Sequence, residues 1–469
     1  MSGLVIPYLS GAEIRTLFVQ FFAERGHVFV PSASLIPAGD QSLLFTNSGM
    51  VQFKQILGGQ VTPTCQRVVN YQRCLRVAGK HNDFEEVGRT TRHQTLFEML
   101  GNWSFGDYFK SEAITWAWEL LTQVYRIPPE HLAVTVYTDD EVAYDLWHRQ
   151  IGLAAERITR WGDLAGGDEG NFWRMAETGP CGRCSEIYFD RGPEFSEGPD
   201  CRPDHNENCV RYLEIWNLVF MEFEQLADGS LVALPYKSVD TGLGLERLAS
   251  VIQGVATNYE TDLFIPLLAK LAEILGPRQP DNCFAHQVIA DHTRAVTFLL
   301  ADGLTPGNNG PAYVLRHLLR RAVWQAQSLG YEQPFLANLA EIVIDTMGQA
   351  YPELEINHAK ILAVITREEE QFARTLAAGR VQVGRTLAKL GNFSRRPGRE
   401  ATDLPFDAPT MAGDEAFKLY DTYGFPLDLT VDLAAEYGVR VDSTGFEVAM
   451  AAQVARSRQY KISEALKDR

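Results

Sequence analysis

Residues 236–247 read Tyr-Lys-Ser-Val-Asp-Thr-Gly-Leu-Gly-Leu-Glu-Arg. A strand-like run leads into Gly242 and Gly244 and then into a helix-like segment that carries Arg247. Glycine lets a backbone approach a ligand closely, and a strand, a tight glycine turn and a helix N-terminus together make a natural anion site. The stretch lacks the third glycine of the dinucleotide fingerprint and the Gly-Lys-Ser/Thr of a P-loop. It is therefore either a nucleotide site of another kind or a plain helix start, and the preceding residues supply the evidence to choose between them.

The preceding residues predict a β-hairpin. Residues 212–225 form a long strand-like run, residues 231–234 form a second one, and Asp228-Gly229 lies between them. Asp-Gly between two such runs is a strong hairpin signal. Neighbouring strands are then antiparallel, which argues against a doubly wound nucleotide fold, because the parallel strands of that fold are joined by crossover helices.

The rest of the chain divides by character into two parts. Helical spacing of apolar residues predicts helices over 11–25 and 111–124, and β-branched residues predict strands over 27–30 and 132–138. Beyond residue 256 helical patterns dominate, at 284–302, 311–328, 335–349 and 357–390, while 391–413 has the composition of a loop. We expect an α+β domain over residues 1–256, with an antiparallel sheet flanked by helices, and a mostly helical domain over residues 257–469.

The composition of the chain narrows the expected cellular compartment and the kinds of binding partner. The 469 residues are 45% hydrophobic, carry a net charge of −17, and contain no run near the ~20 apolar residues of a membrane span. The N-terminus lacks the pattern of a signal peptide, so we expect a cytoplasmic protein without a membrane partner. The acidic total argues against broad nucleic-acid binding but allows a local basic patch. Arg316, Arg320 and Arg321 are the candidates, and a solvated helix face is the equal alternative.

Four of the seven cysteines lie close together in the sequence: Cys181, Cys184, Cys201 and Cys209, with His205 between the last two. A cytosolic C-x-x-C pair indicates metal or redox chemistry more often than a structural disulfide, and the first pair has the spacing of zinc ligands. The second pair is not C-x-x-C. A zinc site made by the four sulfurs, with His205 as an alternative ligand, therefore stands beside a set of reduced thiols that bind no metal.

Two segments of the first half have the composition of a site for a flat, charged ligand. In residues 73–83, Arg76 and Lys80 flank a short glycine-containing segment and can point at one anion, although a surface turn is the alternative. In residues 93–107, Phe97 and Trp103 either frame a flat ring or belong to the core.

These segments together resemble the catalytic half of the alanyl-tRNA synthetases, a family of class II aminoacyl-tRNA synthetases. The matching segments run in order along nearly the whole chain, at 45–50, 73–83, 97–102, 178–182, 214–217, 239–242, 313–316 and 419–426. The resemblance implies that class II motif 1 ends near Pro31, that motif 2 spans about 73–105, and that motif 3 is the stretch 236–247.

The resemblance also implies a set of site residues. Arg76 would contact the α-phosphate of ATP and the carboxylate of the amino acid, and adenine would lie between Phe97 and Arg247. Asp240 would bind the α-amino group of alanine and Asn217 its carboxylate. The remaining implied residues are Lys80 and Gly242 for ATP, and Met50 and Trp173 for the small side-chain pocket. Arg76, Asp240 and Arg247 would be the catalytic residues.

The implied chemistry needs no nucleophile from the protein. The alanine carboxylate attacks the α-phosphorus of ATP to give alanyl-adenylate and pyrophosphate, and the 3′-terminal hydroxyl of the tRNA then attacks the adenylate. Such a reaction depends on positioning and on neutralising charge, which arginines and Mg²⁺ supply. The family edits its errors in a separate domain beyond the end of this chain. We therefore expect an N-terminal portion or a natural short form, acting as a monomer.

The helical half would bind the acceptor stem of tRNA(Ala). By resemblance, Asn308 and Asp421 match two residues that read the base edges of a G·U pair, and the three arginines would contact phosphates. Without the resemblance, Asn308 is a turn residue and Asp421 a helix cap. Two alternatives remain, an enzyme that activates alanine without tRNA and a non-catalytic tRNA-binding relative.

Overall fold

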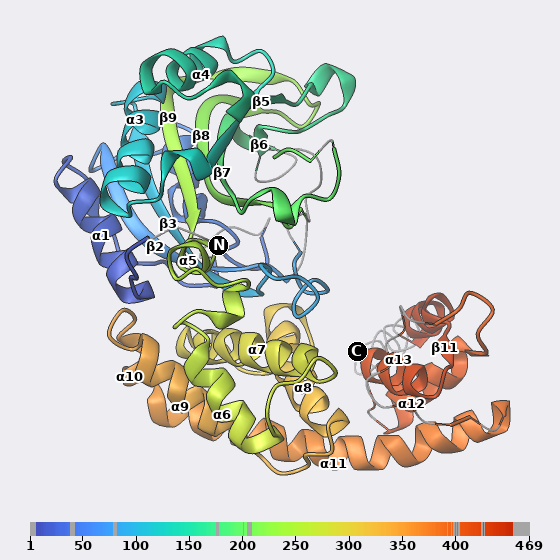
Figure 1. The fold of residues 1–469 in the computed structure, drawn as a ribbon. Helices are drawn as coiled ribbons and strands as arrows, with labels where there is room; N and C mark the ends of the chain where they lie inside the picture. Colours follow the sequence, from blue (N-terminus) through green and yellow to red (C-terminus); the bar gives the residue numbers. More distant parts are fainter. Residues whose placement is uncertain are drawn as a thin grey trace, which may run out of the picture.

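The computed structural model describes residues 6–453, except 38–42, 78–81, 175–177, 200, 204–208, 392, 395, 397–398, 400, 402–403, 424 and 426. A β-sheet with helices around it forms the first half of the chain, and helices form most of the second half (Figure 1). The α+β class and the helical second half predicted from the sequence are confirmed.

The described residues contain a sheet of nine strands in the order β1-β2-β3-β9-β8-β7-β4-β5, with β6 beside β7. The strands are β1 (Val28–Phe29), β2 (Arg67–Leu75), β3 (Leu96–Phe105), β4 (Leu132–Tyr137), β5 (Ile158–Trp161), β6 (Phe172–Arg174), β7 (Gly179–Asp190), β8 (Tyr212–Gln225) and β9 (Leu231–Gly244). The central pairs are antiparallel as predicted. The prediction needs correction at both edges, where β1 with β2 and β4 with β5 are parallel. Parallel neighbours need a connection through other elements and leave no hairpin signal in the sequence.

The predicted hairpin between β8 and β9 is confirmed, but β9 runs further than expected. Gly242 and Gly244 lie within the strand and not in a tight turn, and neither has a positive φ. Gly242 leaves room for a different neighbour, because a Cβ there would lie 2.8 Å from the sulfur of Met99 on the neighbouring strand and would require that side chain to shift. The helix that carries Arg247 begins directly after Gly244.

The helices of the first half are α1 (Gly11–Ala23), α2 (Lys54–Leu57), α3 (Lys110–Glu119), α4 (Glu141–Asp145) and α5 (Leu245–Ile252). The two helices predicted here are confirmed as α1 and α3, and α3 continues into a π-helical turn over Leu120–Val124. The side chains of Ser10 and Glu13 form a capping box that fixes where α1 begins. The predicted strands at 27–30 and 132–138 are confirmed as β1 and β4.

The helices of the second half are α6 (Ile265–Leu275), α7 (Cys283–Ala301), α8 (Gly310–Ser328), α9 (Leu336–Met347), α10 (Glu353–Ile356), α11 (His358–Leu390), α12 (Gly413–Tyr423) and α13 (Leu427–Glu436). The four predicted helices are confirmed as α7, α8, α9 and α11. The predicted loop 391–413 also holds the short strand β10 (Thr410–Met411), paired with β11 (Arg440–Val441). In the described part of the chain, no helix combines the length and the apolar character needed to cross a membrane.

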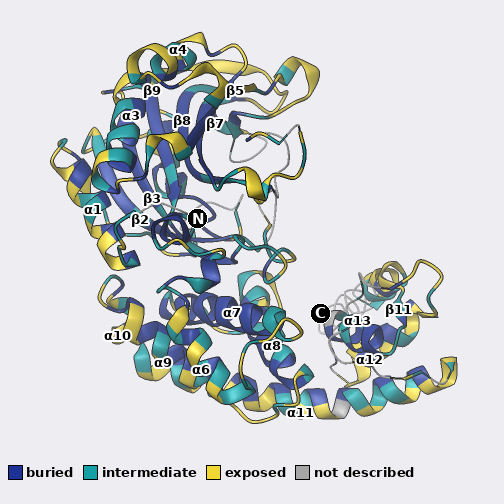
Figure 2. Ribbon diagram, viewed as in Figure 1, coloured by how far each residue is buried: buried dark blue, intermediate teal, exposed yellow. Residues whose placement is uncertain are grey.

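The sheet and the helical half share a hydrophobic core. One cluster joins Leu35, Phe45, Leu75 and Leu96 of the first half to buried residues of α7, α8, α9 and α11. Figure 2 shows α7 as the most deeply buried helix, between the sheet and the remaining helices. By contrast, α12 and α13 lie apart from α6–α10, near the far end of α11 (Figure 1). The boundary at residue 256 stays a prediction.

A buried carboxylate connects the two halves. Glu98 on β3 has no exposed area and accepts bonds from Arg15 Nε at 2.6 Å and Arg15 Nη2 at 2.8 Å. Tyr351 OH donates to it at 2.8 Å, and Arg294 of α7 lies 3.9 Å away and pairs with Glu246 at 2.7 Å. Burial alone would raise the pKa of Glu98, but Arg15 and Arg294 outweigh it and hold the pKa below its usual value. The side chain is therefore an ionised anchor between sheet and helices.

We expect the Glu98→Gln substitution to lower the free energy of unfolding by about 3–5 kcal/mol, because it leaves the Arg15 cation buried without its partner. Urea denaturation of the two proteins measures the difference. The matched control is Glu119→Gln, which breaks the half-exposed Arg25–Glu119 pair and costs about 1 kcal/mol or less. Equal losses in the two variants would contradict the role of Glu98.

Candidate active site

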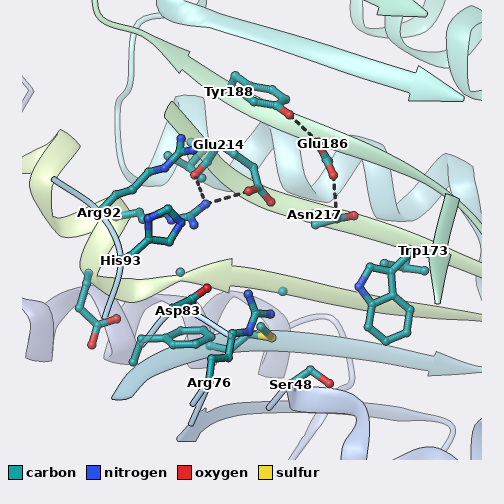
Figure 3. A pocket seen from close by; sticks show the side chains of 18 of the residues that line it. Ser48, Arg76, Asp83, Arg92, His93, Trp173, Glu186, Tyr188, Glu214 and Asn217 are labelled. Atoms are coloured by element: carbon teal, nitrogen blue, oxygen red, sulfur yellow. Dashed lines mark hydrogen bonds and ion pairs between the residues drawn. The ribbon is translucent and has the colours of Figure 1, made fainter. Parts of the chain in front are cut away.

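A cavity of about 530 Å³ opens on the sheet between β3, β7, β8 and β9 (Figure 3). Most of the residues predicted to bind ATP or alanine line it: Arg76, Phe97, Trp173, Asn217, Asp240, Gly242 and Arg247. Two predicted residues do not. Met50 is fully buried and packs in the cluster that includes Phe53 and Trp103, and Lys80 lies outside the described residues.

Arg76 is held at the end of β2 by two contacts. Its Nε donates to the backbone oxygen of Asn47 at 3.1 Å, and its guanidinium lies 5.0 Å from the centre of the Phe97 ring. The backbone of Asp83 donates to the oxygen of Arg76 at 3.2 Å, which brings the segment after residue 81 back to the pocket. These contacts fix a planar cation beside an aromatic face, the arrangement that suits an aromatic ligand with an anionic group.

Arg247 is held by β8. Its Nη1 donates to the side chain of Glu214 at 2.8 Å and to the backbone oxygen of the same residue at 3.0 Å. Burial would raise the pKa of Glu214, but the ion pair with Arg247 outweighs burial and lowers it. The pair therefore holds Arg247 in the lining of the pocket, which Phe97 also lines.

Asp240 is a buried carboxylate with a different environment. Asp240 is 6% exposed, and burial raises the pKa of its carboxyl group to about 7. Trp103, its cross-strand partner, acts in the opposite direction and favours the ionised form. No cation of the described chain contributes to this pKa. A carboxylate in such a position is stabilised by a cationic group that comes with a ligand.

Glu186 on β7 was missed by the sequence analysis. It accepts from Asn217 Nδ2 at 2.9 Å and from Tyr188 OH at 2.5 Å, and all three side chains appear in Figure 3. Burial, with repulsion from Glu214, raises the pKa of Glu186 to about 8. β7 also carries Arg183, Ser185 and Asp190, so no sequence pattern singled out Glu186.

Arg92 and His93 were also missed. They lie at the side of the pocket opposite Trp173 in Figure 3. Burial, and after it the neighbouring Arg247, lowers the pKa of Arg92 to about 10 and the pKa of His93 to about 3. The imidazole is therefore neutral, and the cationic side of the cavity is formed by arginines.

The pocket carboxylates Glu186 and Glu214 repel each other, which adds to the raised pKa of Glu186, and a hydrated Mg²⁺ near both would favour their ionised forms. This ion is usually bound in proteins by one or two carboxylates together with substrate phosphates. The described residues contain no group of three or more side chains that could hold a metal by themselves. The site therefore fits a magnesium ion that arrives with a phosphate ligand.

The four cysteines do not assemble into a zinc site. Cys181 and Cys184 pack in separate hydrophobic clusters, and burial raises the pKa of Cys181 to about 11 and that of Cys184 well above its usual value. Cys201 and Cys209 lie with their sulfurs 3.6 Å apart, and the alternative ligand His205 lies outside the described residues.

The three arginines of α8 contact partners within the protein, and their contacts with tRNA phosphates stay a prediction. All three are half-buried. Arg316 donates to the side chain of Asn308 and to Glu368, the latter at 3.1 Å. The guanidinium of Arg320 lies 5.2 Å from the Phe372 ring, and Arg321 contacts Phe84. The i, i+4 spacing of Arg316 and Arg320 did not reveal that their side of α8 faces the rest of the protein.

The two predicted base readers are exposed and lie in different parts of the helical half. Asn308 precedes α8, and Asp421 is on α12. Asp421 accepts a bond of 3.4 Å from Gln453.

Comparison with known proteins places the chain in a family. The model of the tRNA synthetases class II (A) matches residues 13–468. An alanine–tRNA ligase of Bordetella bronchiseptica is 50% identical over 464 residues, covering 98% of this chain and 51% of that protein. One of Xylella fastidiosa (strain 9a5c) is 49% identical over 449 residues, covering 95% of this chain and 49% of that protein.

The chain spans about half the length of the curated relatives it matches. Among solved structures, apo histidyl-tRNA synthetase of S. aureus matches with a TM-score of 0.32 and 10% identity, covering 59% of this chain and 80% of that chain. Because the family model matches from residue 13 to residue 468, the chain belongs to the tRNA synthetases class II (A).

Proposed function

We propose that this chain activates L-alanine with ATP to form alanyl-adenylate and transfers the alanyl group to the 3′ end of tRNA(Ala). The observation that carries the proposal is one cavity with arginines at one side and the isolated carboxylate of Asp240 within it. The arginines suit the phosphates of a nucleoside triphosphate, and the carboxylate suits the α-ammonium group of an amino acid. The identity to relatives named alanine–tRNA ligase supports the choice of alanine.

In the activation step, Arg76 holds the α-phosphate and Phe97 and Arg247 flank the adenine ring. A carboxylate oxygen of alanine forms a bond to the α-phosphorus, and the bond from that phosphorus to the pyrophosphate oxygen breaks. No side chain is consumed, so the rate comes from alignment and charge neutralisation. Class II synthetases use ATP and Mg²⁺ in general, and Glu186 and Glu214 would hold the ion, which supplies further charge neutralisation.

Alanine would be recognised by three residues of the sheet. Asp240 binds the α-ammonium group, and Asn217 binds the carboxylate. Asn217 is kept in place because one of its N–H bonds donates to Glu186. Trp173 limits the space for the side chain, whereas Met50 supports the pocket from beneath.

For tRNA, we propose Asn308 and Asp421 as readers of a G·U pair in the acceptor stem. Arg316 donates to the Asn308 oxygen, which fixes the direction in which the amide N–H bonds point. The cytoplasmic, monomeric state stays part of the proposal. Zinc is left out of it, because the cysteines that the structure describes do not gather around one point.

Alanine-dependent exchange of pyrophosphate into ATP tests the activation step. We expect exchange by the wild-type protein and a loss of about 100-fold or more in kcat/KM for alanine in Asp240→Asn, because a charge-assisted bond in a buried site is lost. The KM for ATP should stay within about twofold. A folded wild-type protein without exchange would overturn the proposed function.

The pH dependence should follow the ionisation of Asp240. Its pKa is raised to about 7, and only the ionised form pairs with the alanine ammonium. We therefore expect kcat/KM for alanine to fall about tenfold per pH unit below pH 7 and to level off above it. Glu186, whose pKa is raised to about 8, titrates in the same range, so the profile is compared with that of Asp240→Asn, which should lose the dependence near pH 7. A flat profile between pH 5.5 and 8 would contradict this role.

Substitutions of Asn308 and Asp421 should affect transfer to tRNA but not alanine activation. We expect Asp421→Ala and Asn308→Ala to keep exchange within about twofold and to lower charging of a tRNA(Ala) transcript about 10- to 100-fold, the usual effect of one lost base contact. Asp414→Ala is the matched control, since it removes another exposed carboxylate from α12. Loss of exchange in Asp421→Ala, or equal charging of G·U and G·C transcripts by the wild type, would contradict the assignment.

A further inference from the structure

The wall of the active site that carries Arg92 and His93 is the segment 83–95, and residues of the helical half bind both of its ends. At the far end, Thr95 donates its backbone N–H to Asp291 of α7 at 2.8 Å. Asn258 donates to the backbone oxygen of Arg92 at 3.1 Å. The segment therefore depends on residues that do not themselves line the pocket.

The near end is held by an aromatic and cationic cluster, the Phe84 clasp, made of Phe84, His292, His317 and Arg321. The Phe84 ring lies 5.5 Å from that of His292 on α7, at an interplanar angle of 22°, and 4.9 Å from that of His317 on α8. The guanidinium carbon of Arg321 lies 4.2 Å from the centre of the Phe84 ring. Arg321 Nη1 also donates to the backbone oxygen of Phe84 at 2.9 Å.

The clasp has the properties of a rigid contact. Arg321 uses its planar fork twice, once on the ring and once on the carbonyl of the same residue, which a lysine could not do. His292 donates its Nδ1–H to Asp291 at 2.9 Å, and burial lowers its pKa to about 4. The histidine is therefore neutral and does not repel the arginine.

A short path leads from the clasp to the proposed catalytic arginine. Phe84 follows Asp83, which lines the pocket and whose backbone N–H donates to the oxygen of Arg76 at 3.2 Å. Displacing Phe84 therefore displaces Asp83, and with it a constraint on Arg76. Trp173, at the other side of the pocket, has no such connection to the clasp, because it lies on β6.

We propose that the Phe84 clasp positions the ATP-binding wall of the pocket, which makes Phe84, His317 and Arg321 positioning residues supplied largely from α8. This inference rests on the proposed function. It assigns Arg321 to the pocket wall and not to an RNA phosphate. It also connects two sites through one helix, because α8 carries both Arg316, which holds Asn308, and Arg321, which holds Phe84.

The kinetic test uses Phe84→Leu and Arg321→Met in the pyrophosphate exchange assay. We expect KM for ATP to rise about three- to tenfold in each, the range for one partly buried cation–π contact, while KM for alanine stays within about twofold. Phe84→Tyr, which keeps the ring, should restore KM for ATP. Unchanged KM for ATP in both variants, or parallel changes for both substrates, would overturn the proposal.

The control is Arg25→Met, which removes a contact of the same kind outside the pocket. Arg25 lies 3.5 Å from the centre of the Phe21 ring and donates to the Phe21 backbone oxygen at 3.0 Å. It therefore matches Arg321, which likewise stacks on the residue whose carbonyl it binds. We expect both KM values of this variant to stay within about twofold of the wild type.

Hydrogen–deuterium exchange tests the clasp independently of activity. We expect peptides from residues 83–95 to exchange faster in Phe84→Leu and Arg321→Met than in the wild type, and at wild-type rates in Arg25→Met. This result would stand even if the protein did not activate alanine. A failure of the clasp proposal can therefore be told apart from a failure of the proposed function. Unchanged protection of 83–95 in both clasp variants would overturn the positioning role.

Discussion

The ionised side chain of Glu98 is the constraint on which the arrangement of sheet and helices depends. A carboxylate with no exposed area is costly unless cations and donors surround it, and here they come from α1, from α7 and from Tyr351. The sheet therefore reaches its stable form only when the helical half is in place. Arg294 extends the same constraint to the pocket, because it pairs with Glu246, the neighbour of Arg247 on α5.

Glu98 and Asp240 show how one sheet produces both structure and chemistry. Both are buried carboxylates on adjacent strands, and at each of them burial acts to raise the pKa. Arginines outweigh burial at Glu98, whereas no cation of the described chain does so at Asp240. The negative charge of Asp240 is therefore available to pair with a cationic group of a ligand. The α-ammonium group of an amino acid is such a cation.

Sequence reasoning predicted local features and failed where distant residues decide. The Asp-Gly turn predicted the β8–β9 hairpin because both strands flank it, but nothing local indicated the parallel edge pairs. Gly242 was predicted to lie in a turn, but it lies in β9 beside the Met99 side chain of β3. The C-x-x-C spacing of Cys181 and Cys184 gave no information about their apolar burial. Glu186 was missed because a single polar residue in a strand has no periodic signal.

The arginines of α8 show why charge counts and spacing are insufficient to locate an RNA surface. Their spacing placed Arg316 and Arg320 on one side of a helix, and the expected direction was outward. In the folded chain, Arg316 pairs with Glu368 and Arg321 lies on Phe84. A guanidinium committed to an internal partner contributes little to counterion release on RNA binding. In this arrangement α8 holds Asn308 through Arg316 and the backbone of Phe84 through Arg321.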